Sequence, residues 1–268
     1  MRNRLLYAQI ASFILLLVTV VTSCHHSSKD AADRGVVIDS ICKDTVLLMK
    51  KGQQNPNLHI TLNLKFLTGP HSREINDTIL RQVLSPDYLS LSSDSISPVQ
   101  MVDSFLVSYY RDYCSFYGQV WSEEPQSTNA NISLNIQSEV HEGRDGILVY
   151  LAHISRKQGV EQMDYTKAYN IDLDNGIRLH LGDVFVPGFE RDLNEQITRQ
   201  LCKQFNVDDE AKMADAGLFV HTDVYATHNF ILDNDSIHFI YISGEIASSD
   251  IGEITVTIPY SDISNILR

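Results

Sequence analysis

Few residues in this chain have the types and spacing that catalytic chemistry requires. Cys24, His25 and His26 are three metal-ligand types in a row, but adjacent histidines on a polar tail point to different sides and no structured third ligand lies nearby. Ser40 and Lys43 have the spacing of a serine–lysine nucleophile motif, yet its usual SDN and KTG partners are absent. The sequence also contains no GxSxG, Walker, GxGxxG or HExxH motif. These absences favour a non-catalytic role.

Acidic residues offer the remaining route to catalysis. Glu123 with Glu124, or Glu245 with Glu253, would serve as acid and base only if the fold brought them into one cleft. Solvated charges are the simpler interpretation. Residues 172–176, DLDNG, slightly resemble a calcium loop but lack the later ligands, and the dispersed histidines have no metal-ligand spacing. We therefore expect no metal site, no cofactor and no catalytic residue.

The net charge narrows the class of partner. The formal net charge is −13 and no basic run occurs, which argues against nucleic acid as a partner. An acidic surface attracts cationic proteins at low salt, although it also serves solubility alone.

Beyond Cys24 the cysteines are Cys42, Cys114 and Cys202, which are far apart and form no CxxC pair. We expect free thiols, with at most one disulfide among them.

The first 23 residues are typical of a signal peptide. Arg2 and Arg4 give a cationic start, and residues 5–21 form an apolar stretch. At roughly 17 residues this stretch is short for a bilayer span of about 20, and no basic stop-transfer cluster follows it. We expect cleavage rather than a permanent transmembrane helix.

The stretch Val21-Thr22-Ser23-Cys24 resembles the lipobox of bacterial lipoproteins. The resemblance implies that Cys24 is acylated and becomes the new N-terminus, with residues 24–35 as a polar tether. Two or three acyl chains hold a protein at a membrane that a single chain binds marginally. We therefore expect a membrane-anchored lipoprotein, in the outer membrane, facing the periplasm or the cell exterior.

Periodicity predicts an α+β fold with antiparallel sheets, packed helices and two subdomains. Residues 36–120 read as strand, helix and helix: Leu58 to Phe66 alternate, Ile75, Ile79 and Val83 share a helical stripe, and Ser97 with Pro98 begins a second helix. A loop from Gly118 to Ala130 marks the predicted boundary. Residues 130–268 read as mixed strands and one long helix, with strands at 132–136, 147–154, 165–173, 177–181, 230–232, 237–242 and 253–258, and the helix at 189–205.

One short triplet recurs more often than composition explains. Asp followed by Ser or Thr and an aliphatic residue resembles the O-glycosylation sequon of Bacteroidetes envelope proteins, which would suit an exported lipoprotein. The alternative is that the triplet simply marks a turn followed by a strand, since Asp and Ser or Thr favour turns and aliphatic residues favour strands. The candidate acceptors are Ser40, Thr45, Thr78, Ser95 and Ser236.

The C-terminal stretch resembles the closing part of the family named for the anti-sigma factor RsiV. The matching motifs are Gly244-Glu245-Ile246-Ala247, Gly252 and Ile258-Pro259-Tyr260, and upstream the passage YNIDLDNGIRLHLGDVF before the helix from Phe189. The resemblance covers residues 130–268 well and 55–117 loosely. One departure is clear: the family's Gly-Gly-Ala-His segment is replaced here by residues 156–160, RKQGV.

This resemblance implies an α+β domain that binds or senses something in the cell envelope. The family includes an anti-sigma factor whose extracellular part binds lysozyme, modules beside polysaccharide deacetylases, and lipoproteins of unassigned function. We therefore expect a non-catalytic binding or sensing domain for a glycan such as peptidoglycan, or for a cationic protein such as lysozyme. The alternative is a glycan- or peptidoglycan-directed hydrolase or deacylase whose carboxylates converge only in three dimensions.

Overall fold

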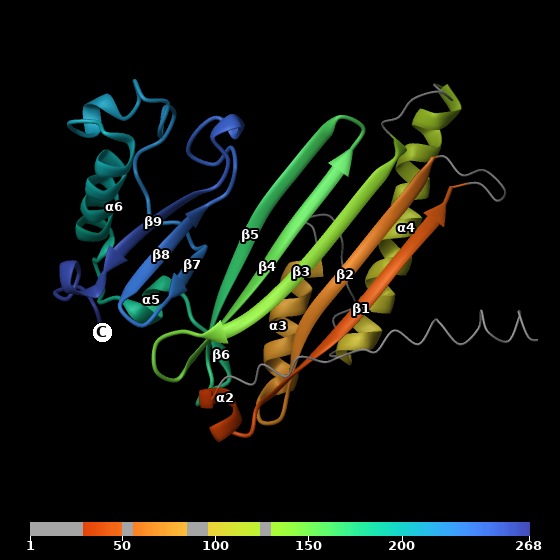
Figure 1. Cartoon of the computed structure of the whole chain (residues 1–268), viewed down its shortest axis with the longest axis horizontal. Helices are drawn as coiled ribbons and strands as arrows, with labels where there is room; N and C mark the ends of the chain where they lie inside the picture. Colours follow the sequence, from red (N-terminus) through yellow and green to blue (C-terminus); the bar gives the residue numbers. More distant parts are fainter. Residues whose placement is uncertain (1–28, 50–55, 85–95, 124–129) are drawn as a thin grey trace, which may run out of the picture.

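The computed structural model describes residues 29–49, 56–84, 96–123 and 130–268. The predicted signal peptide and Cys24 lie outside these ranges. Two sheets stand side by side in Figure 1, with helices behind the larger sheet and beside the smaller one. The elements in chain order are α2 (Lys29–Asp33), β1 (Val37–Leu48), β2 (Asn57–Thr68), α3 (Ser72–Leu84), α4 (Pro98–Glu123), β3 (Ile132–Glu142), β4 (Ile147–Gln158), β5 (Glu161–Asp172), β6 (Ile177–Arg178), α5 (Leu181–Val184), α6 (Glu190–Phe205), β7 (Phe230–Leu232), β8 (Ser236–Tyr241) and β9 (Ile254–Pro259).

The larger sheet has six strands in the order β1-β2-β3-β4-β5-β6. Neighbouring strands are antiparallel except β2 and β3, which run parallel because α3 and α4 connect them. Both helices cover one face of the sheet (Figure 1). Leu58, Ile60, Leu62 and Leu64 are buried on that face, while Asn63 on the other face is exposed. The alternation in β2 therefore sets which face carries the helices.

The helices begin and pack as their sequences indicate. Ile75, Ile79 and Val83 form the buried stripe of α3. At the start of α4 the side chain of Gln100 accepts a hydrogen bond from the Ser97 N–H at 3.1 Å, and the Gln100 N–H donates to Ser97 Oγ at 3.3 Å. This is a capping box. The loop predicted from Gly118 to Ala130 was wrong in its first part, because α4 continues to Glu123.

The smaller sheet, β7-β8-β9, is antiparallel and carries α6 along one side (Figure 1). Leu193, Ile197 and Leu201 form the buried stripe of α6, as the spacing predicts. The helix ends at Asn206, whose left-handed φ of 53° lets its N–H cap the last carbonyls. No helix in the described ranges has the length and hydropathy of a membrane span.

The two sheets are joined through side chains rather than by strand pairing. On the outer edge of β5, the Ala168 N–H donates to Asn229 Oδ1 at 2.7 Å. The Thr166 N–H donates to Glu253 Oε2 at 2.9 Å. Asn170 bridges in the other direction: its amide donates to Phe230 O and accepts from Leu232 N, both at 2.8 Å. Polar side chains thus replace the backbone ladder that a seventh strand would supply.

A small apolar contact and a close backbone approach complete this junction. Val149, Leu151 and Ala168 of the larger sheet pack against Ile240 of the smaller one. At the β3–β4 turn the Arg144 N–H donates to Leu232 O at 3.0 Å. Position 143 has to be glycine, since a Cβ there would overlap that same carbonyl oxygen.

The packed apolar residues form two main clusters, one drawn from residues 31–173 and one from residues 181–267. The predicted α+β class with two parts is therefore confirmed. Strand β1 was not predicted, because both of its faces carry polar residues and its edge faces solvent. The hairpin at residues 172–178 was predicted correctly from Asp174-Asn175-Gly176, where Gly176 has a φ of 68°.

Replacing Asn170 with alanine should destabilise the protein by about 2–4 kcal/mol. The side chain is 1% exposed, and its loss leaves Phe230 O and Leu232 N buried without partners. Urea unfolding of the two proteins measures the difference. The control is Asn63→Ala, an exposed amide on β2, for which we expect a change within about 0.5 kcal/mol. A loss below about 1 kcal/mol for Asn170→Ala would contradict the bridging role.

Candidate functional site

The serine–lysine spacing does not form a nucleophile in the structure. Both residues belong to strand β1, where positions three apart point to opposite faces. Lys43 instead forms an ion pair with Asp103 of α4 at 3.4 Å. Cys42, Cys114 and Cys202 are free thiols.

Glu245 and Glu253 each accept a hydrogen bond from a backbone N–H group. Glu245 accepts hydrogen bonds from the Tyr225 hydroxyl and from the Ile242 N–H, both at 2.8 Å. Burial, followed by the hydrogen bond to Glu245, raises the pKa of Tyr225 above its ordinary value, so this hydroxyl stays protonated. Glu253 accepts from the Thr166 N–H. The side chains of Glu123 and Glu124 lie outside the described part of the chain.

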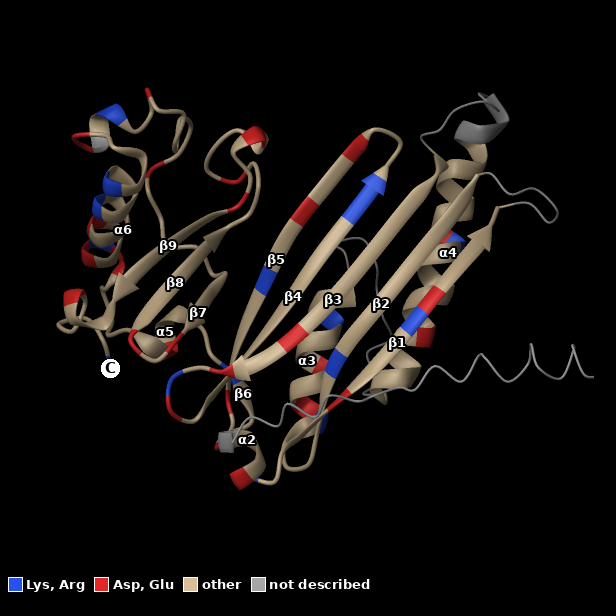
Figure 2. Cartoon of the chain, viewed as in Figure 1, with Lys and Arg blue, Asp and Glu red and all other residues tan. Residues whose placement is uncertain are grey.

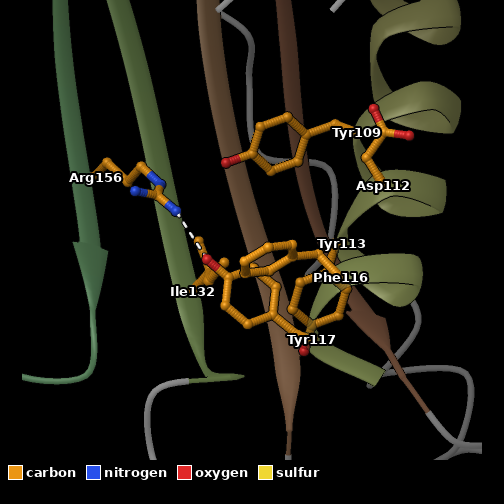
Figure 3. A pocket seen from close by; sticks show the side chains of 7 residues that line it. All are labelled: Tyr109, Asp112, Tyr113, Phe116, Tyr117, Ile132 and Arg156. Atoms are coloured by element: carbon orange, nitrogen blue, oxygen red, sulfur yellow. Dashed lines mark hydrogen bonds between the residues drawn. The ribbon is translucent and has the colours of Figure 1, made fainter. Parts of the chain in front are cut away.

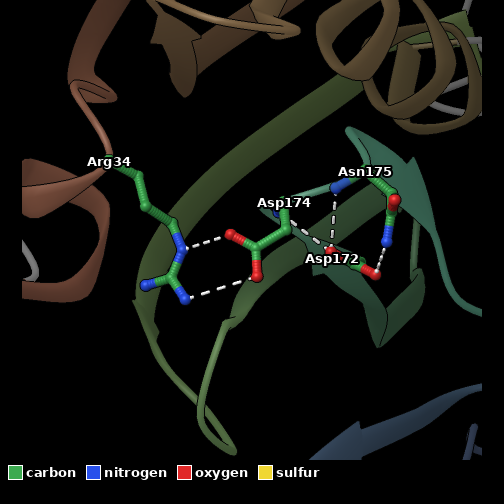
Figure 4. A network of polar contacts seen from close by, with 4 residues as sticks. All are labelled: Arg34, Asp172, Asp174 and Asn175. Carbon is green, nitrogen blue, oxygen red and sulfur yellow. Dashed lines mark hydrogen bonds and ion pairs between the residues drawn. The ribbon is translucent and has the colours of Figure 1, made fainter.

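The loop with a slight calcium-like pattern is closed by its own residues (Figure 4). Asp172 accepts from the N–H groups of Asp174 and Asn175 at 2.9 and 3.0 Å, as in an Asx turn. Asp174 pairs with Arg34 of the segment before β1 at 2.7 Å, which holds the pKa of the Asp174 carboxyl below its usual value. Within the described ranges no group of three or more His, Cys, Asp or Glu side chains could hold a metal ion.

Three histidines on the sheets each lie beside a threonine and an acidic residue. His153 has Thr166 Oγ1 at 3.2 Å from Nδ1 and Glu139 Oε1 at 3.5 Å from Nε2. The other two are His59 with Asp44 and Thr61, and His238 with Asp233 and Thr257. The hydrogen bond from His59 is the main reason that the pKa of Asp44 lies below its usual value. A trio that recurs three times is more typical of polar cross-strand pairing than of an active site.

A cavity of about 380 Å³ lies between α4 and the larger sheet, and we call it the aromatic pocket (Figure 3). Its size falls in the range of ligand pockets. Four aromatic side chains of α4 line one side, and strands β3 and β4 contribute the other. The lining residues are Tyr109, Asp112, Tyr113, Phe116, Tyr117, Ile132 and Arg156.

Helical spacing places these rings in a row. Tyr109, Tyr113 and Tyr117 recur every four residues and so lie along one stripe of α4. The rings of Tyr113 and Tyr117 are 5.6 Å apart, and those of Phe116 and Tyr117 are 4.9 Å apart in an edge-to-face arrangement. The row runs from the buried Tyr109 to the half-buried Tyr117, and the exposed Phe116 lies beside Tyr117.

The polar groups of the aromatic pocket are largely bound to one another or to backbone. The Tyr113 hydroxyl donates to Ala130 O at 2.9 Å, and burial raises the pKa of Tyr113, so the hydroxyl stays protonated. The Tyr117 hydroxyl donates to Gln158 Oε1 at 3.0 Å. Arg156 points from β4 toward the same corner, where Nη2 donates to Gln158 Oε1 at 2.7 Å and to Tyr117 at 3.3 Å (Figure 3). These bonds fix the rings before any ligand arrives.

The apolar surface extends beyond the pocket. A narrower hollow of about 70 Å³ shares Tyr109 and Arg156 with it and continues toward the C-terminal end of α3. Large apolar side chains are exposed nearby: Phe116 is 67% exposed, and Met163, which lines the hollow, is 57% exposed.

Sequence reasoning missed the aromatic pocket, although it did single out one of its parts. The segment that departs from the RsiV-like family, residues 156–160, forms the end of β4 and the turn into β5, and it supplies Arg156 and Gln158 to this site. The signal available in the sequence was the stripe Tyr109, Tyr113 and Tyr117. Such a stripe usually belongs to the core, and only the exposure of Phe116 distinguishes it.

The predicted O-glycosylation sites remain predictions, and their acceptors differ in access. Ser40 on β1 and Thr78 on α3 are exposed, whereas Thr45 and Ser236 are half-buried. Ser95 lies outside the described residues. The predicted lipidation at Cys24 also falls outside them and remains a prediction.

Protein isolated from its native host should exceed the mass of the lipidated polypeptide by whole glycan units if the triplets are modified. Exposed hydroxyls accept a glycan most readily, so Ser40→Ala and Thr78→Ala should each remove one unit in intact-mass measurements. Ser104→Ala is the control, because Ser104 is exposed and follows an aspartate but precedes an aromatic residue. A mass equal to the lipidated polypeptide alone would contradict the prediction.

Comparisons with known proteins identify a family in the C-terminal part. Residues 182–261 match the family model described as "Protein of unknown function (DUF3298)". No curated protein matches the chain. A DUF3298 family member from Bacteroides fragilis has a similar crystal structure, with a TM-score of 0.76 and 21% identity over 87% of this chain and 94% of that chain. A family protein from Pseudomonas aeruginosa gives a TM-score of 0.61 and 18% identity, over 86% and 94% of the two chains.

The likeness to these two structures covers both sheets but, at such low identity, shows only that the fold is shared. The family match confirms the resemblance inferred for the C-terminal motifs, and it includes Gly244, Gly252 and Pro259. The link to an anti-sigma factor remains a prediction. The match to the DUF3298 family model thus covers residues 182–261, which contain α6 and the smaller sheet.

Proposed function

We propose that this protein is a lipid-tethered, non-catalytic binding module of the cell envelope that docks a protein partner on the aromatic pocket. The observation that carries the proposal is Phe116, a large apolar ring that is 67% exposed and lies beside the aromatic row at Tyr117. Exposed aromatic side chains beside a pocket are typical anchors of protein interfaces, where Tyr, Trp and Arg dominate the binding energy.

The state of the polar groups favours a protein over a glycan at this pocket. A sugar presents many hydroxyl groups, and each one needs a hydrogen-bond partner when it leaves water. The Tyr113 and Tyr117 hydroxyls and the Arg156 Nη2 are already bound to other groups. An apolar side chain of a protein partner needs no such partners and would bury against the rings at a gain of about 25 cal/mol per Å².

Charge favours a cationic partner. The chain has a formal net charge of −13, although the pocket itself contains one residue of each sign, Asp112 and Arg156. In Figure 2 acidic residues occur on the loops, α6 carries both acidic and basic residues, and the strands of the larger sheet are mostly uncharged. Such a field speeds association with a basic protein and weakens as salt is added. A basic envelope-active protein such as lysozyme is a suitable probe.

The alternative, a glycan-directed hydrolase or deacylase, receives less support. That chemistry needs two carboxylates converging on a substrate bond, about 5 to 10 Å apart. Glu245 instead accepts from the Ile242 N–H, and Glu253 accepts from the Thr166 N–H of β5. A binding role agrees better with this arrangement.

The tether itself is tested by Cys24→Ser. Serine cannot accept the thioether-linked lipid, so the variant should leave the membrane fraction and no longer partition into detergent, while the unaltered protein does both. A variant at Cys202, which forms no disulfide among the described residues, controls for the loss of a cysteine: Cys202→Ser. Unchanged fractionation of Cys24→Ser would remove the basis for the envelope location.

Docking is tested by Phe116→Ala with hen egg-white lysozyme as the cationic probe. We expect at least a tenfold weaker Kd, on the order of the loss at an interface anchor, measured by calorimetry at low salt. The matched control is Val107→Ala, since Val107 is 68% exposed on the same helix but does not line the pocket. Val107→Ala should bind as the unaltered protein does.

Equal weakening by both variants would show that the contact is spread over α4 and not centred on the pocket. An unaltered protein that fails to bind lysozyme, and binds peptidoglycan fragments at this pocket instead, would favour a glycan over a protein partner. Circular dichroism confirms that each variant is folded before binding is compared.

A further inference from the structure

The segment that follows the predicted tether is fastened to one end of the larger sheet. Helix α2 buries Ala31, which is 1% exposed, and the Val36 N–H donates to Ala31 O at 2.8 Å after the turn. Arg34 Nε donates to Asp174 Oδ1 at 2.7 Å, in the turn between β5 and β6 (Figure 4). We call these contacts of Ala31, Arg34, Val36 and Asp174 the clasp.

Apolar packing holds the clasp more firmly than its ion pair does. Arg34 and Asp174 are both partly exposed to solvent, and ion pairs of that kind contribute little to stability. Ala31 and Val36, in contrast, belong to the main apolar cluster of the larger sheet. Releasing α2 would expose both side chains to water, so the attached form is favoured.

Backbone contacts join the clasp to the turns around it. Gly69, in the turn after β2, approaches the chain so closely that a Cβ there would lie 2.3 Å from Gly35 O. The Leu173 N–H donates to Gly146 O at 3.1 Å, which links the β5–β6 turn to the β3–β4 turn. Three turns and α2 therefore meet at the same end of the sheet, and the point where the predicted tether joins the domain is fixed.

The aromatic pocket lies at the opposite end of the sheet. Strand β4 connects the two ends: it begins directly after Gly146, beside the clasp, and ends with Arg156 and Gln158 at the pocket. Its 12 residues span about 35–40 Å at the usual rise per residue. Figure 1 shows the same arrangement, with α2 at the lower end of the sheet and the last turns of α4 at the upper end.

The predicted tether is short compared with this distance. Lys29, the first residue of α2, follows Cys24 by five residues, which extend to at most about 18 Å. Without the clasp the first fixed residue would be Val37 of β1, 13 residues from Cys24, with a reach of about 45 Å. The clasp thus keeps the α2 end of the sheet close to the surface to which Cys24 is attached, and steric exclusion by that surface favours orientations in which the other end extends away.

We propose that the α2 end of the larger sheet faces the membrane and that the aromatic pocket opens away from it, toward a water-soluble partner. This inference rests on the lipid tether proposed at Cys24. A protein embedded in the same membrane would have to rise about 35–40 Å above the lipid to reach the pocket, the length of β4. A soluble protein meets no such barrier.

The test measures energy transfer from a donor dye at either end of β4 to a headgroup-labelled lipid. The lipidated full-length protein is inserted into phosphatidylcholine vesicles that contain this acceptor lipid. An azide-bearing amino acid carries the donor and replaces either Asp145, just before β4, or Val160, just after it, so the cysteines stay unaltered. Both positions are exposed, which leaves the fold intact, and thermal unfolding of the labelled proteins confirms it.

We expect at least about twofold higher transfer from position 145, because β4 separates the two positions by about 35–40 Å. A matched control lengthens the tether by inserting about 30 Gly and Ser residues between Ser28 and Lys29, which adds a root-mean-square reach of about 30 Å. This insertion should lower the transfer from position 145 and reduce the difference between the two positions.

Equal transfer from both positions, or higher transfer from position 160, would overturn the orientation while leaving the tether in place. Failure of the protein to float with the vesicles would remove the tether, and the orientation with it. Lysozyme takes no part in the measurement, so the orientation is tested independently of the docking proposal.

Discussion

The edge of β5 is the constraint on which the rest of the structure depends. A strand edge with unpaired N–H and C=O groups has to be covered, paired or hydrated. Here it is covered by Asn229 and Glu253, which reach across from the smaller sheet, while the buried amide of Asn170 reaches back to β7. These bonds set the smaller sheet at a fixed place on the face of the larger one.

The state of the tyrosine hydroxyls narrows what the aromatic pocket can bind. The hydroxyls of Tyr113 and Tyr117 are bound within the protein, which leaves the ring surface as the main contact area for a partner. Because desolvation penalises unpaired polar groups, such a surface would suit apolar side chains better than hydroxyl-rich ligands.

The sequence predicted the elements whose pattern is local. Alternation marked β2, the Ser97 cap marked the start of α4, and the four-residue stripe from Leu193 marked α6, since each depends on neighbours within about two turns or one strand. The parallel pairing of β2 with β3 could not be inferred, because it joins residues more than 70 positions apart. The aromatic pocket could not be inferred either, because its lining comes from α4, β3 and β4 together. Strand β1 was not predicted for a different reason. An edge strand buries few side chains, so its sequence shows no strong alternation of apolar and polar residues.

His153 shows why a constellation of suitable residues is not yet an active site. Thr166, His153 and Glu139 stand in the order hydroxyl, imidazole and carboxylate that a nucleophilic triad uses. A nucleophile has to reach its substrate, however, and Thr166 is 9% exposed, with its own N–H bound to Glu253 rather than aimed at an oxyanion. The trios around His59 and His238 repeat the pattern on other strands. Polar cross-strand pairing therefore explains all three trios.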